Sequence, residues 1–231
     1  MPISSESVQV WVIRVSEHEI QHWRPRLSTS EWDRAMRFRM PADQQRFVIA
    51  RGILRTLLGR YLNLLPASVE FTVNEFGKPA VAGPITFSVS HSGDYALLAF
   101  ANGLELGVDV EHFSGECVVS ELAQRILSPS EYQRFNSLAD AQRISAFFQI
   151  WTLKESLLKA IGSGLSIAPE SIEIAFFPDA PRLLTSEAPQ IKDVNAWTLR
   201  SLSIDDEDYA AAIAVKHPNP LIEVQRYNSF L

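Results

Sequence analysis

The sequence predicts an α+β fold made of two similar α/β halves related by a pseudo-twofold axis. Two observations predict it: segments of the first half recur in the second in the same order, and both halves combine strand patterns with one long helical pattern. We therefore expect each half to be a small antiparallel-type sheet packed on a long helix. The active site is expected at the interface of the halves, because clefts between such units are favoured ligand sites.

The internal repeat rests on four segment pairs that keep their order along the chain. The pairs are residues 27–34 (LSTSEWDR) with 127–134 (LSPSEYQR), 51–59 with 154–162, 68–71 with 171–174, and 94–99 with 208–213. Their spacing drifts only at expected loops, which indicates a duplicated unit. We place the halves at residues 1–112 and 113–231, joined near residues 112–116.

The first half begins with an alternating, β-rich strand pattern at residues 8–15. Ser30 is expected to cap a helix that begins at Glu31, and Asp43 is expected to cap a longer helix over residues 44–62. The other strands of this half, separated by Gly, Pro and Asn-Gly breaks, are expected at residues 69–74, 86–90, 95–101 and 107–111.

The second half follows the same plan with more helix. Helical patterns cover residues 120–127, 130–136 and 140–161. Strands are expected at residues 171–176, 196–203 and 209–215.

The composition is typical of an ordinary globular chain, with 46% hydrophobic and 21% charged residues among 231. No apolar run reaches the roughly 18 residues of a membrane span, and residues 1–9 lack a signal-peptide pattern. The single cysteine, Cys117, excludes an intrachain disulfide and a multi-thiolate metal site. We expect a cytoplasmic monomer that does not bind membranes.

Charge is distributed unevenly along the chain, whose net charge is −6. Residues 1–60 hold 10 Arg, no Lys and 6 acidic residues, whereas residues 61–231 hold 11 basic and 21 acidic residues. The overall acidity argues against general nucleic-acid binding. The arginine-only start indicates phosphate recognition, because the guanidinium fork matches phosphate oxygens, although a solvated helix face explains it equally well.

Asp109 and Glu111 flank Val110 in an expected strand, so both carboxylates point to one face while Val108 and Val110 point to the other. Two neighbouring acids at a strand end favour a bound cation, and oxygen-only ligands favour Mg²⁺, with Mn²⁺ as a close relative. The alternative is an exposed polar strand face.

Glu155 adds a third carboxylate. The expected helix over residues 140–161 carries an apolar stripe, and at 100° per residue Glu155 lies roughly 40° from the centre of that stripe. The stripe residues are Ile144, Phe147, Phe148, Trp151 and Leu158. A carboxylate on a packed face needs a partner, and Lys159 follows one turn later, so an ordinary Glu155–Lys159 surface pair is the alternative. We expect Asp109, Glu111 and Glu155 to form a three-carboxylate metal site.

Residues 87–93 (FSVSHSG) end a strand in hydroxyls, an imidazole and a glycine. A Ser/His nucleophile is disfavoured, since adjacent strand residues face opposite ways and no nucleophile elbow is present. A phosphate or nucleotide cradle fits better. The turn at residues 75–79 (EFGKP) would hold Lys78 beside such a ligand, although alone it is only a loop.

Together these segments resemble the 4′-phosphopantetheinyl transferases of the larger, surfactin-synthetase-activator type. The resemblance is carried by Gly-Lys-Pro at 77–79, Ser-His-Ser at 90–92, the strand at 107–111 (GVDVE) and the helix at 151–159 (WTLKESLLK). It spans roughly residues 34–215 and implies a pseudo-dimer of two α/β halves. The implied reaction transfers the phosphopantetheine arm of coenzyme A to a serine of an apo acyl or peptidyl carrier protein and releases adenosine 3′,5′-bisphosphate.

The resemblance also implies roles for individual residues. Asp109, Glu111 and Glu155 would hold Mg²⁺, and Lys159 would contact a phosphate and could protonate the leaving oxygen. The serine of the carrier needs a base, and the candidate is Glu155 or a metal-bound water that Glu155 orients. The remaining coenzyme A contacts would be Arg46, Arg51, Lys78, Pro79, Ser90 and His91, with Lys78 and Pro79 at the adenine, Ser90 and His91 at the phosphates of the nucleotide, and Arg46 at the 3′-phosphate. In this reading the first half binds the nucleotide and ends in the metal strand, and the second half supplies the catalytic helix.

The surface that binds the carrier protein is expected to be apolar with basic spots. Residues 117–127 fit this description, although core packing would explain their apolar residues equally well.

Two other functions stay open. A Mg²⁺-dependent phosphohydrolase would use the same acids with water as the nucleophile, and a non-catalytic coenzyme A- or carrier-binding module would need none of them.

Overall fold

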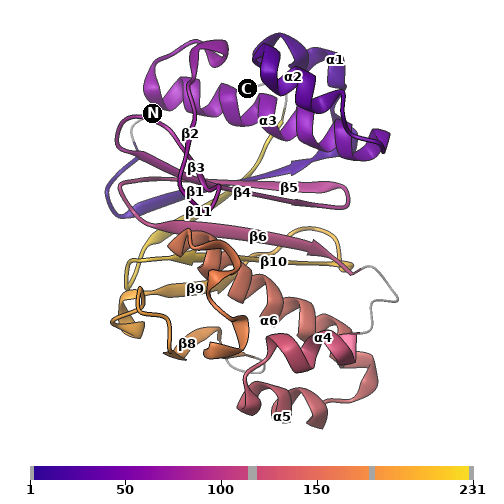
Figure 1. Cartoon of the computed structure of the whole chain (residues 1–231), viewed down its shortest axis with the longest axis vertical. Coiled ribbons are helices and arrows are strands. Elements are labelled where there is room, and N and C mark those ends of the chain that lie inside the picture. Colours follow the sequence, from indigo (N-terminus) through magenta and orange to yellow (C-terminus); the bar gives the residue numbers. More distant parts are fainter. Residues whose placement is uncertain (1–2, 114–118, 177–179, 229–231) are drawn as a thin grey trace.

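Two β-sheets packed face to face form the centre of the computed structural model, which describes residues 3–113, 119–176 and 180–228. The first sheet has the order β11–β1–β5–β4, and the second has the order β6–β10–β9. Their bounds are β11 Leu221–Arg226, β1 Ser7–Arg14, β5 Tyr95–Asn102, β4 Ile85–Ser92, β6 Leu106–His112, β10 Tyr209–Val215 and β9 Thr198–Ser201. Figure 1 shows the two sheets as central layers, with α3 above and α6 below them.

Alternating strand residues build three apolar layers. Val8, Leu97, Val108 and Ile213 meet between the two sheets. The opposite face of the first sheet is covered by α3 (Pro41–Leu62), and the opposite face of the second by α6 (Asp140–Ile161). The mixed helix and sheet class expected from the sequence is therefore confirmed.

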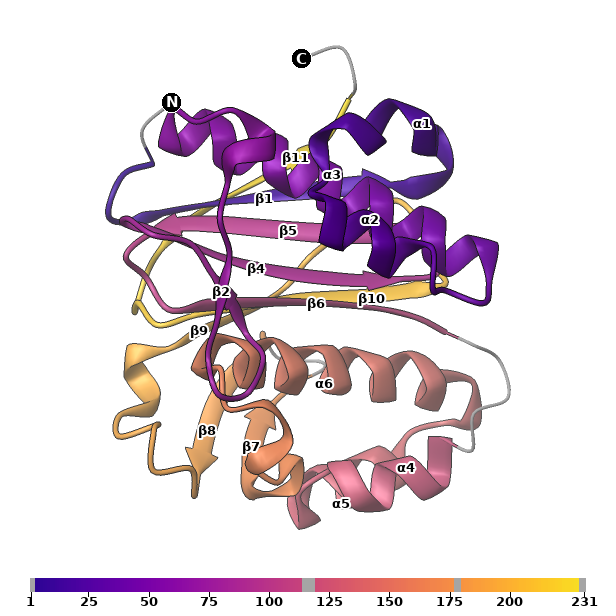
Figure 2. The same ribbon diagram turned by 45° about the horizontal axis from the view of Figure 1, so that its top comes forward.

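Smaller elements frame these layers. The helices are α1 Ile20–Trp23, α2 Thr29–Ala35, α4 Val119–Ile126 and α5 Pro129–Ser137, and the short strands are β2 Thr72–Val73, β3 Pro79–Ala80, β7 Ile172–Ala175 and β8 Arg182–Ser186. The β2–β3 hairpin leaves the first sheet and reaches the end of α6 (Figure 2), where Asn74 Nδ2 donates to the Gly162 carbonyl at 2.9 Å.

Several sequence expectations need correction. Ser28, not Ser30, caps α2, because its side chain and Glu31 form a reciprocal capping box. Asp43 does not cap α3: the helix starts with Pro41 after Met40, and Asp43 pairs with Arg46 one turn along. Ile144 does not belong to the buried stripe of α6, since 43% of its surface is exposed.

Strand exchange links the early and late parts of the chain. β6 lies before residue 113 yet pairs with β10, and β11 from the end of the chain pairs in parallel with β1. The expected junction at residues 112–116 lies mostly outside the described residues. Within the described ranges, no helix has the length and apolar character needed to cross a membrane.

Candidate active site

Six of the residues expected to form the site line one cavity of about 220 Å³ at the seam between β4 and β6. They are Ser90 and His91 from β4, Asp109 and Glu111 from β6, and Glu155 and Lys159 from α6. The structure thus brings together residues that are up to 69 positions apart in the sequence.

Local sequence explains how α6 comes so close to β6. Val108 and Val110 point into the layer between the sheets, so Asp109 and Glu111 point to the opposite face, on which α6 packs. Gly107 has no side chain, and a Cβ there would clash with the backbone of Ser156 and Ala160. The glycine therefore allows the helix backbone to lie directly on the strand.

Asp109 is the most buried acid of the site, with 2% of its surface exposed. Its Oδ1 atom accepts hydrogen bonds from Lys159 Nζ at 2.6 Å and from Ser90 Oγ at 2.8 Å. Burial raises the pKa of Asp109, although the charge and hydrogen bond of Lys159 oppose this shift.

Glu155 and Glu111 also have raised pKa values. Burial and the nearby charge of Asp109 raise the pKa of Glu155 to about 7, against the opposing charge of Lys159. The pKa of Glu111 is raised mainly by burial and then by Asp109, while the hydrogen bond from Ser92 Oγ at 3.0 Å lowers it. The three carboxylates therefore repel one another when all are ionised.

In this conformation the acids are not arranged as a complete metal site: among the described residues no group of three or more Asp, Glu, His or Cys is placed to hold an ion. Two buried carboxylate oxygens nevertheless have no hydrogen-bond partner within the described part of the chain, Asp109 Oδ2 and Glu155 Oε1. An oxygen-only donor set with unpaired, mutually repelling oxygens fits a hard cation such as Mg²⁺.

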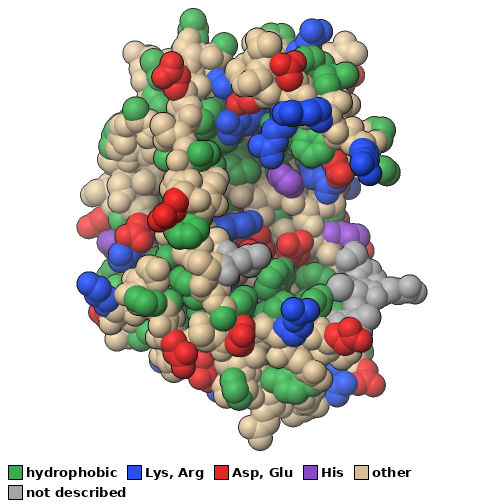
Figure 3. Space-filling view, viewed as in Figure 1, with side chains coloured by type: hydrophobic (Ala, Val, Ile, Leu, Met, Phe, Trp, Pro, Cys, Tyr) green, Lys and Arg blue, Asp and Glu red, His purple; other side chains and the backbone are tan. Residues whose placement is uncertain are grey.

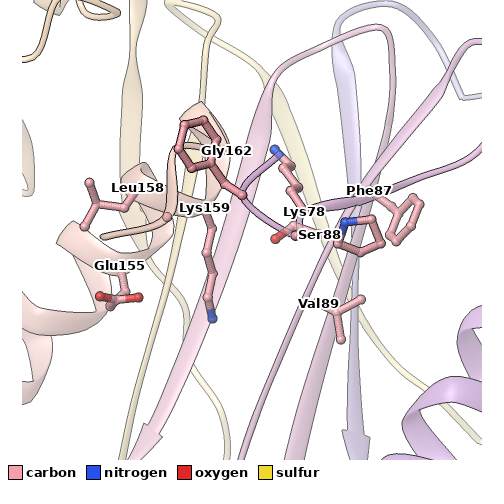
Figure 4. A pocket seen from close by; sticks show the side chains of 12 residues that line it. Lys78, Phe87, Ser88, Val89, Glu155, Leu158, Lys159 and Gly162 are labelled. Atoms are coloured by element: carbon pink, nitrogen blue, oxygen red, sulfur yellow. The ribbon is translucent and has the colours of Figure 1, made fainter. Parts of the chain in front are cut away.

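A second cavity of about 300 Å³ adjoins the first and shares Val89, Glu155 and Lys159 with it (Figure 4). Its other walls are mainly apolar and backbone groups: Phe76, Gly77, Lys78, Pro79, Phe87, Ser88, Leu158, Gly162 and Gly164. The expected adenine contacts Lys78 and Pro79 thus lie in the wall of this cavity.

The Lys78 ammonium is already engaged in the structure. Its Nζ atom donates to the carbonyls of Ala160 at 2.9 Å and Leu106 at 3.3 Å, and burial lowers its pKa. Lys78 therefore caps the C-terminal end of α6, where carbonyl groups lack helical partners.

Arg46 lies near enough to His91, which lines the first cavity, for its charge to act on the imidazole. Loss of solvent around the ring lowers the pKa of His91, and the positive charges of Arg46 and Lys159 lower it further. Figure 3 shows Lys and Arg side chains gathered over the upper right part of the molecule, beside the hollow where acidic and His side chains are visible. An anion beside His91 would meet positive charge from Arg46, which is paired with Asp43 in this structure.

Arg51, the other expected phosphate contact, is held elsewhere. Its Nε atom lies 2.5 Å from Glu31 Oε1, and its guanidinium stacks over Phe71 at 3.6 Å from the ring centre. Arg55 binds the second oxygen of Glu31 at 2.7 Å. Sequence reasoning missed this cluster because Glu31 is recognisable only as a capping residue.

An apolar cavity of about 390 Å³ on the other side of Glu111 was not expected from the sequence. It is lined by Ser92, Gly93, Glu111, His112, Leu122, Ile126, Phe147, Phe148 and Trp151. Leu122 and Ile126 belong to the expected carrier surface at residues 117–127, of which Cys117 and Val118 lie outside the described residues.

Comparison with known proteins agrees with this geometry. Residues 105–214, which carry the acids and the Glu155 helix, match the family described as the 4′-phosphopantetheinyl transferase superfamily. Residues 11–102 match the N-terminal domain of 4′-phosphopantetheinyl transferases. The chain is 36% identical over 222 residues to the 4′-phosphopantetheinyl transferase HetI of Nostoc, covering 93% of this chain and 90% of that protein. This chain belongs to the 4′-phosphopantetheinyl transferase superfamily.

Other members of the superfamily are similar over nearly the whole chain. A 4′-phosphopantetheinyl transferase of Bacillus subtilis is 28% identical and covers 89% of this chain, with 90% of its own length matched. The 4′-phosphopantetheinyl transferase Sfp of Bacillus subtilis strain 168 is 24% identical, with 89% of each chain covered. The resemblance seen in the sequence motifs is therefore confirmed.

Proposed function

We propose that this protein transfers the 4′-phosphopantetheine arm of coenzyme A to a serine of an apo acyl or peptidyl carrier protein, with release of adenosine 3′,5′-bisphosphate. The observation that carries the proposal is the seam cavity, where three carboxylates and Lys159 converge beside a larger cavity of a size suited to part of a nucleotide. Membership in the superfamily supports the same reaction.

Coenzyme A would lie across the two adjoining cavities. The adenine fits the mainly apolar cavity beside Pro79 and the Lys78 turn, and the 3′-phosphate would meet Arg46 and His91 at the mouth. Lys159, which lines both cavities, would contact the pyrophosphate between them. Arg51, paired with Glu31 and stacked on Phe71, would have to leave these partners to contact coenzyme A.

Asp109, Glu111 and Glu155 would hold Mg²⁺, with Mn²⁺ as a substitute, because two of them present buried oxygens that have no hydrogen-bond partner among the described residues. When bound, the ion would supply positive charge against the pyrophosphate oxygens. Val110, between Asp109 and Glu111, points into the core and offers the ion no ligand.

Glu155 would act as the general base. In the metal-free protein, burial and the charge of Asp109 raise the pKa of Glu155 to about 7, so this carboxylate is more basic than that of an ordinary glutamate. It would take the proton of the carrier serine as the serine oxygen bonds to the β-phosphorus of coenzyme A. The bond from that phosphorus to the bridging oxygen breaks, and Lys159 would donate a proton to the leaving phosphate.

We also propose that the fold is a pseudo-twofold duplication with halves at residues 1–112 and 113–231. Equivalent capping boxes support this, Ser28 with Glu31 and Ser128 with Glu131. Each glutamate binds a buried cation of the long helix, Arg55 in one half and Lys154 in the other.

The two buried cations also contact equivalent carbonyls. Arg55 donates to the carbonyls of Pro66 and Val69, and Lys154 donates to those of Pro169 and Ile172. Pro66 and Pro169, like Val69 and Ile172, are 103 positions apart, which is the same offset as in the helix repeat.

With the two units joined in one chain, we propose a cytoplasmic monomer that binds neither nucleic acid nor membrane.

The function is tested by incubating the protein with coenzyme A, Mg²⁺ and a panel of apo carriers from fatty-acid, polyketide and peptide synthesis. Intact-mass measurement of the carrier should show the gain of one phosphopantetheine. Hydrolysis of coenzyme A without carrier labelling would instead establish the phosphohydrolase. Binding of coenzyme A without any turnover would establish a binding module.

A further inference from the structure

Strands β4 and β6 run side by side at the edges of different sheets, without forming one continuous sheet. Hydroxyl groups bridge them at a constant spacing. The backbone N–H groups of Val108, Val110 and His112 donate to the Oγ atoms of Ser88, Ser90 and Ser92, at 3.1, 3.3 and 3.1 Å. We call Ser88, Ser90 and Ser92 the serine ladder.

The residue type suits this position. Ser88, Ser90 and Ser92 alternate along β4, so their side chains share one face and reach the edge of β6. Backbone donors at a buried sheet edge need acceptors, and each hydroxyl offers two acceptor sites and one donor. The serine ladder therefore takes the place of a backbone hydrogen-bond ladder between the sheets.

Two members of the ladder also hold the acids. Ser90 Oγ donates to Asp109 Oδ1 at 2.8 Å, and Ser92 Oγ donates to Glu111 Oε2 at 3.0 Å. Ser90 Oγ accepts a second hydrogen bond from Lys159 Nζ at 2.8 Å. Its one donor and two acceptor sites are thus all used, which leaves no hydroxyl proton for a phosphate.

We propose that Ser90 and Ser92 are positioning residues, which fix Asp109 and Glu111 relative to α6 through the β4–β6 register, and that Ser90 is not a phosphate contact. This rests on the proposed transferase function. Each of these serines accepts a hydrogen bond from a backbone N–H of β6 and donates one to a carboxylate. The same side chain therefore fixes both the register of β6 and the orientation of the acid.

The proposal predicts a split between turnover and substrate affinity. We expect Ser92→Ala to lower kcat at least tenfold while KM for coenzyme A changes less than threefold, and Ser92→Thr, which keeps the hydroxyl, to recover most of the turnover. Ser90→Ala should bind coenzyme A in the presence of EDTA within threefold of wild type. If the Ser90 hydroxyl contacted a phosphate, Ser90→Ala would bind coenzyme A more weakly than this in the same measurement.

Thr86→Val is the matched control. Thr86 shares the strand face of the ladder, but its hydroxyl donates to the Leu104 carbonyl at 2.7 Å and contacts no acid of the site. It should lower the melting temperature and leave kcat within twofold of wild type. The proposal would be overturned if Ser92→Ala kept a kcat near that of wild type, or if Thr86→Val lowered kcat as much as Ser92→Ala does.

Amide hydrogen exchange separates failure of the ladder from failure of the transferase assignment. In Ser92→Ala the His112 amide should exchange faster, and in Ser90→Ala the Val110 amide should, whether or not the protein modifies any carrier. Unchanged exchange would refute the ladder. An inactive wild type with these exchange effects would refute only the proposed function.

Discussion

Lys159 Nζ lies 2.6 Å from Asp109 Oδ1, and this ion pair joins α6 to the edge of β6. The carboxylate is buried, whereas about a third of the lysine side chain is exposed to the cavity. Lys159 therefore neutralises a buried acid and presents part of its surface to a substrate. Its turn of α6 also carries Glu155, so the same helix holds the proposed base and the proposed acid.

Replacing Lys159 by Met should destabilise the fold as well as abolish transfer. The buried carboxylate of Asp109 would lose a charged hydrogen bond, which costs about 1.5–3 kcal/mol. Burial raises the pKa of Asp109, so this carboxyl group is more readily protonated at pH 4.5, where its charge then needs no partner. The variant should therefore lose more free energy of unfolding at pH 8 than at pH 4.5. Urea denaturation at both pH values measures this, with Lys159→Arg as the control that keeps the charge. An equal loss at both pH values would contradict it.

Glu155→Gln should abolish transfer and stabilise the free protein at alkaline pH. The pKa of Glu155 is raised from 4.5 to about 7 in the fold, so the folded state binds more protons than the unfolded state between these values. The contribution of Glu155 to the free energy of unfolding therefore decreases as the pH rises from 4.5 to 7. Glutamine does not titrate, so the variant does not show this decrease. Melting temperatures of the two proteins should agree at pH 4.5 and favour the variant at pH 8. The exposed Glu121→Gln gives the baseline, and a variant less stable than wild type at pH 8 would argue against burial strain at Glu155.

Arg46→Ala should weaken coenzyme A binding roughly tenfold to a hundredfold, the loss of one charged hydrogen bond to a phosphate. At saturating coenzyme A, kcat should stay within threefold of wild type. Calorimetric titration with 3′-dephospho-coenzyme A supplies the control, because the variant and the wild type should bind it equally. If the variant lost as much affinity for the dephospho form, Arg46 would contact another part of the ligand.

Lys78→Met should weaken binding of coenzyme A and 3′-dephospho-coenzyme A to the same extent. The Lys78 ammonium is bonded to the carbonyls of Ala160 and Leu106, so its loss loosens the hairpin that walls the cavity without removing a phosphate contact. Asn74→Ala, which removes the neighbouring bond to Gly162, should reproduce the effect in the same titrations. A loss confined to the 3′-phosphorylated ligand would show that Lys78 turns to the phosphate instead.

The convergence of the acids and Lys159 on one cavity could be expected from the sequence, in part because it depends on local periodicity. Strand alternation places Asp109 and Glu111 on one face, and helical spacing places Glu155 and Lys159 one turn apart, while the resemblance to the transferase motifs placed the strand and the helix in one site. The long helix at residues 140–161 and the strand at 209–215 have the expected bounds.

The partners of these residues could not be predicted, because they depend on long-range packing. Nothing in the local pattern shows that the Ser90 hydroxyl is saturated by Asp109, Val110 and Lys159, or that Glu31 captures Arg51. Lys154, expected only as part of a family motif, is fully buried and bonded to Glu131 at 2.6 Å. Strand β11 was missed because none of its six residues is buried, so it lacks the apolar side that marks a packed strand, and its pairing partner lies over 200 residues away.

The crossed pairing of β6 with β10 and of β11 with β1 has a consequence for synthesis of the protein. When the ribosome has made the first 112 residues, β1 still exposes one edge, and β6 has the serine ladder of β4 on one side but lacks its sheet partner β10 on the other. Both strands must wait for segments translated roughly a hundred residues or more later. The early part of the chain therefore completes its sheets only near the end of translation, and cutting the gene between the halves would leave two fragments with bare, aggregation-prone edges.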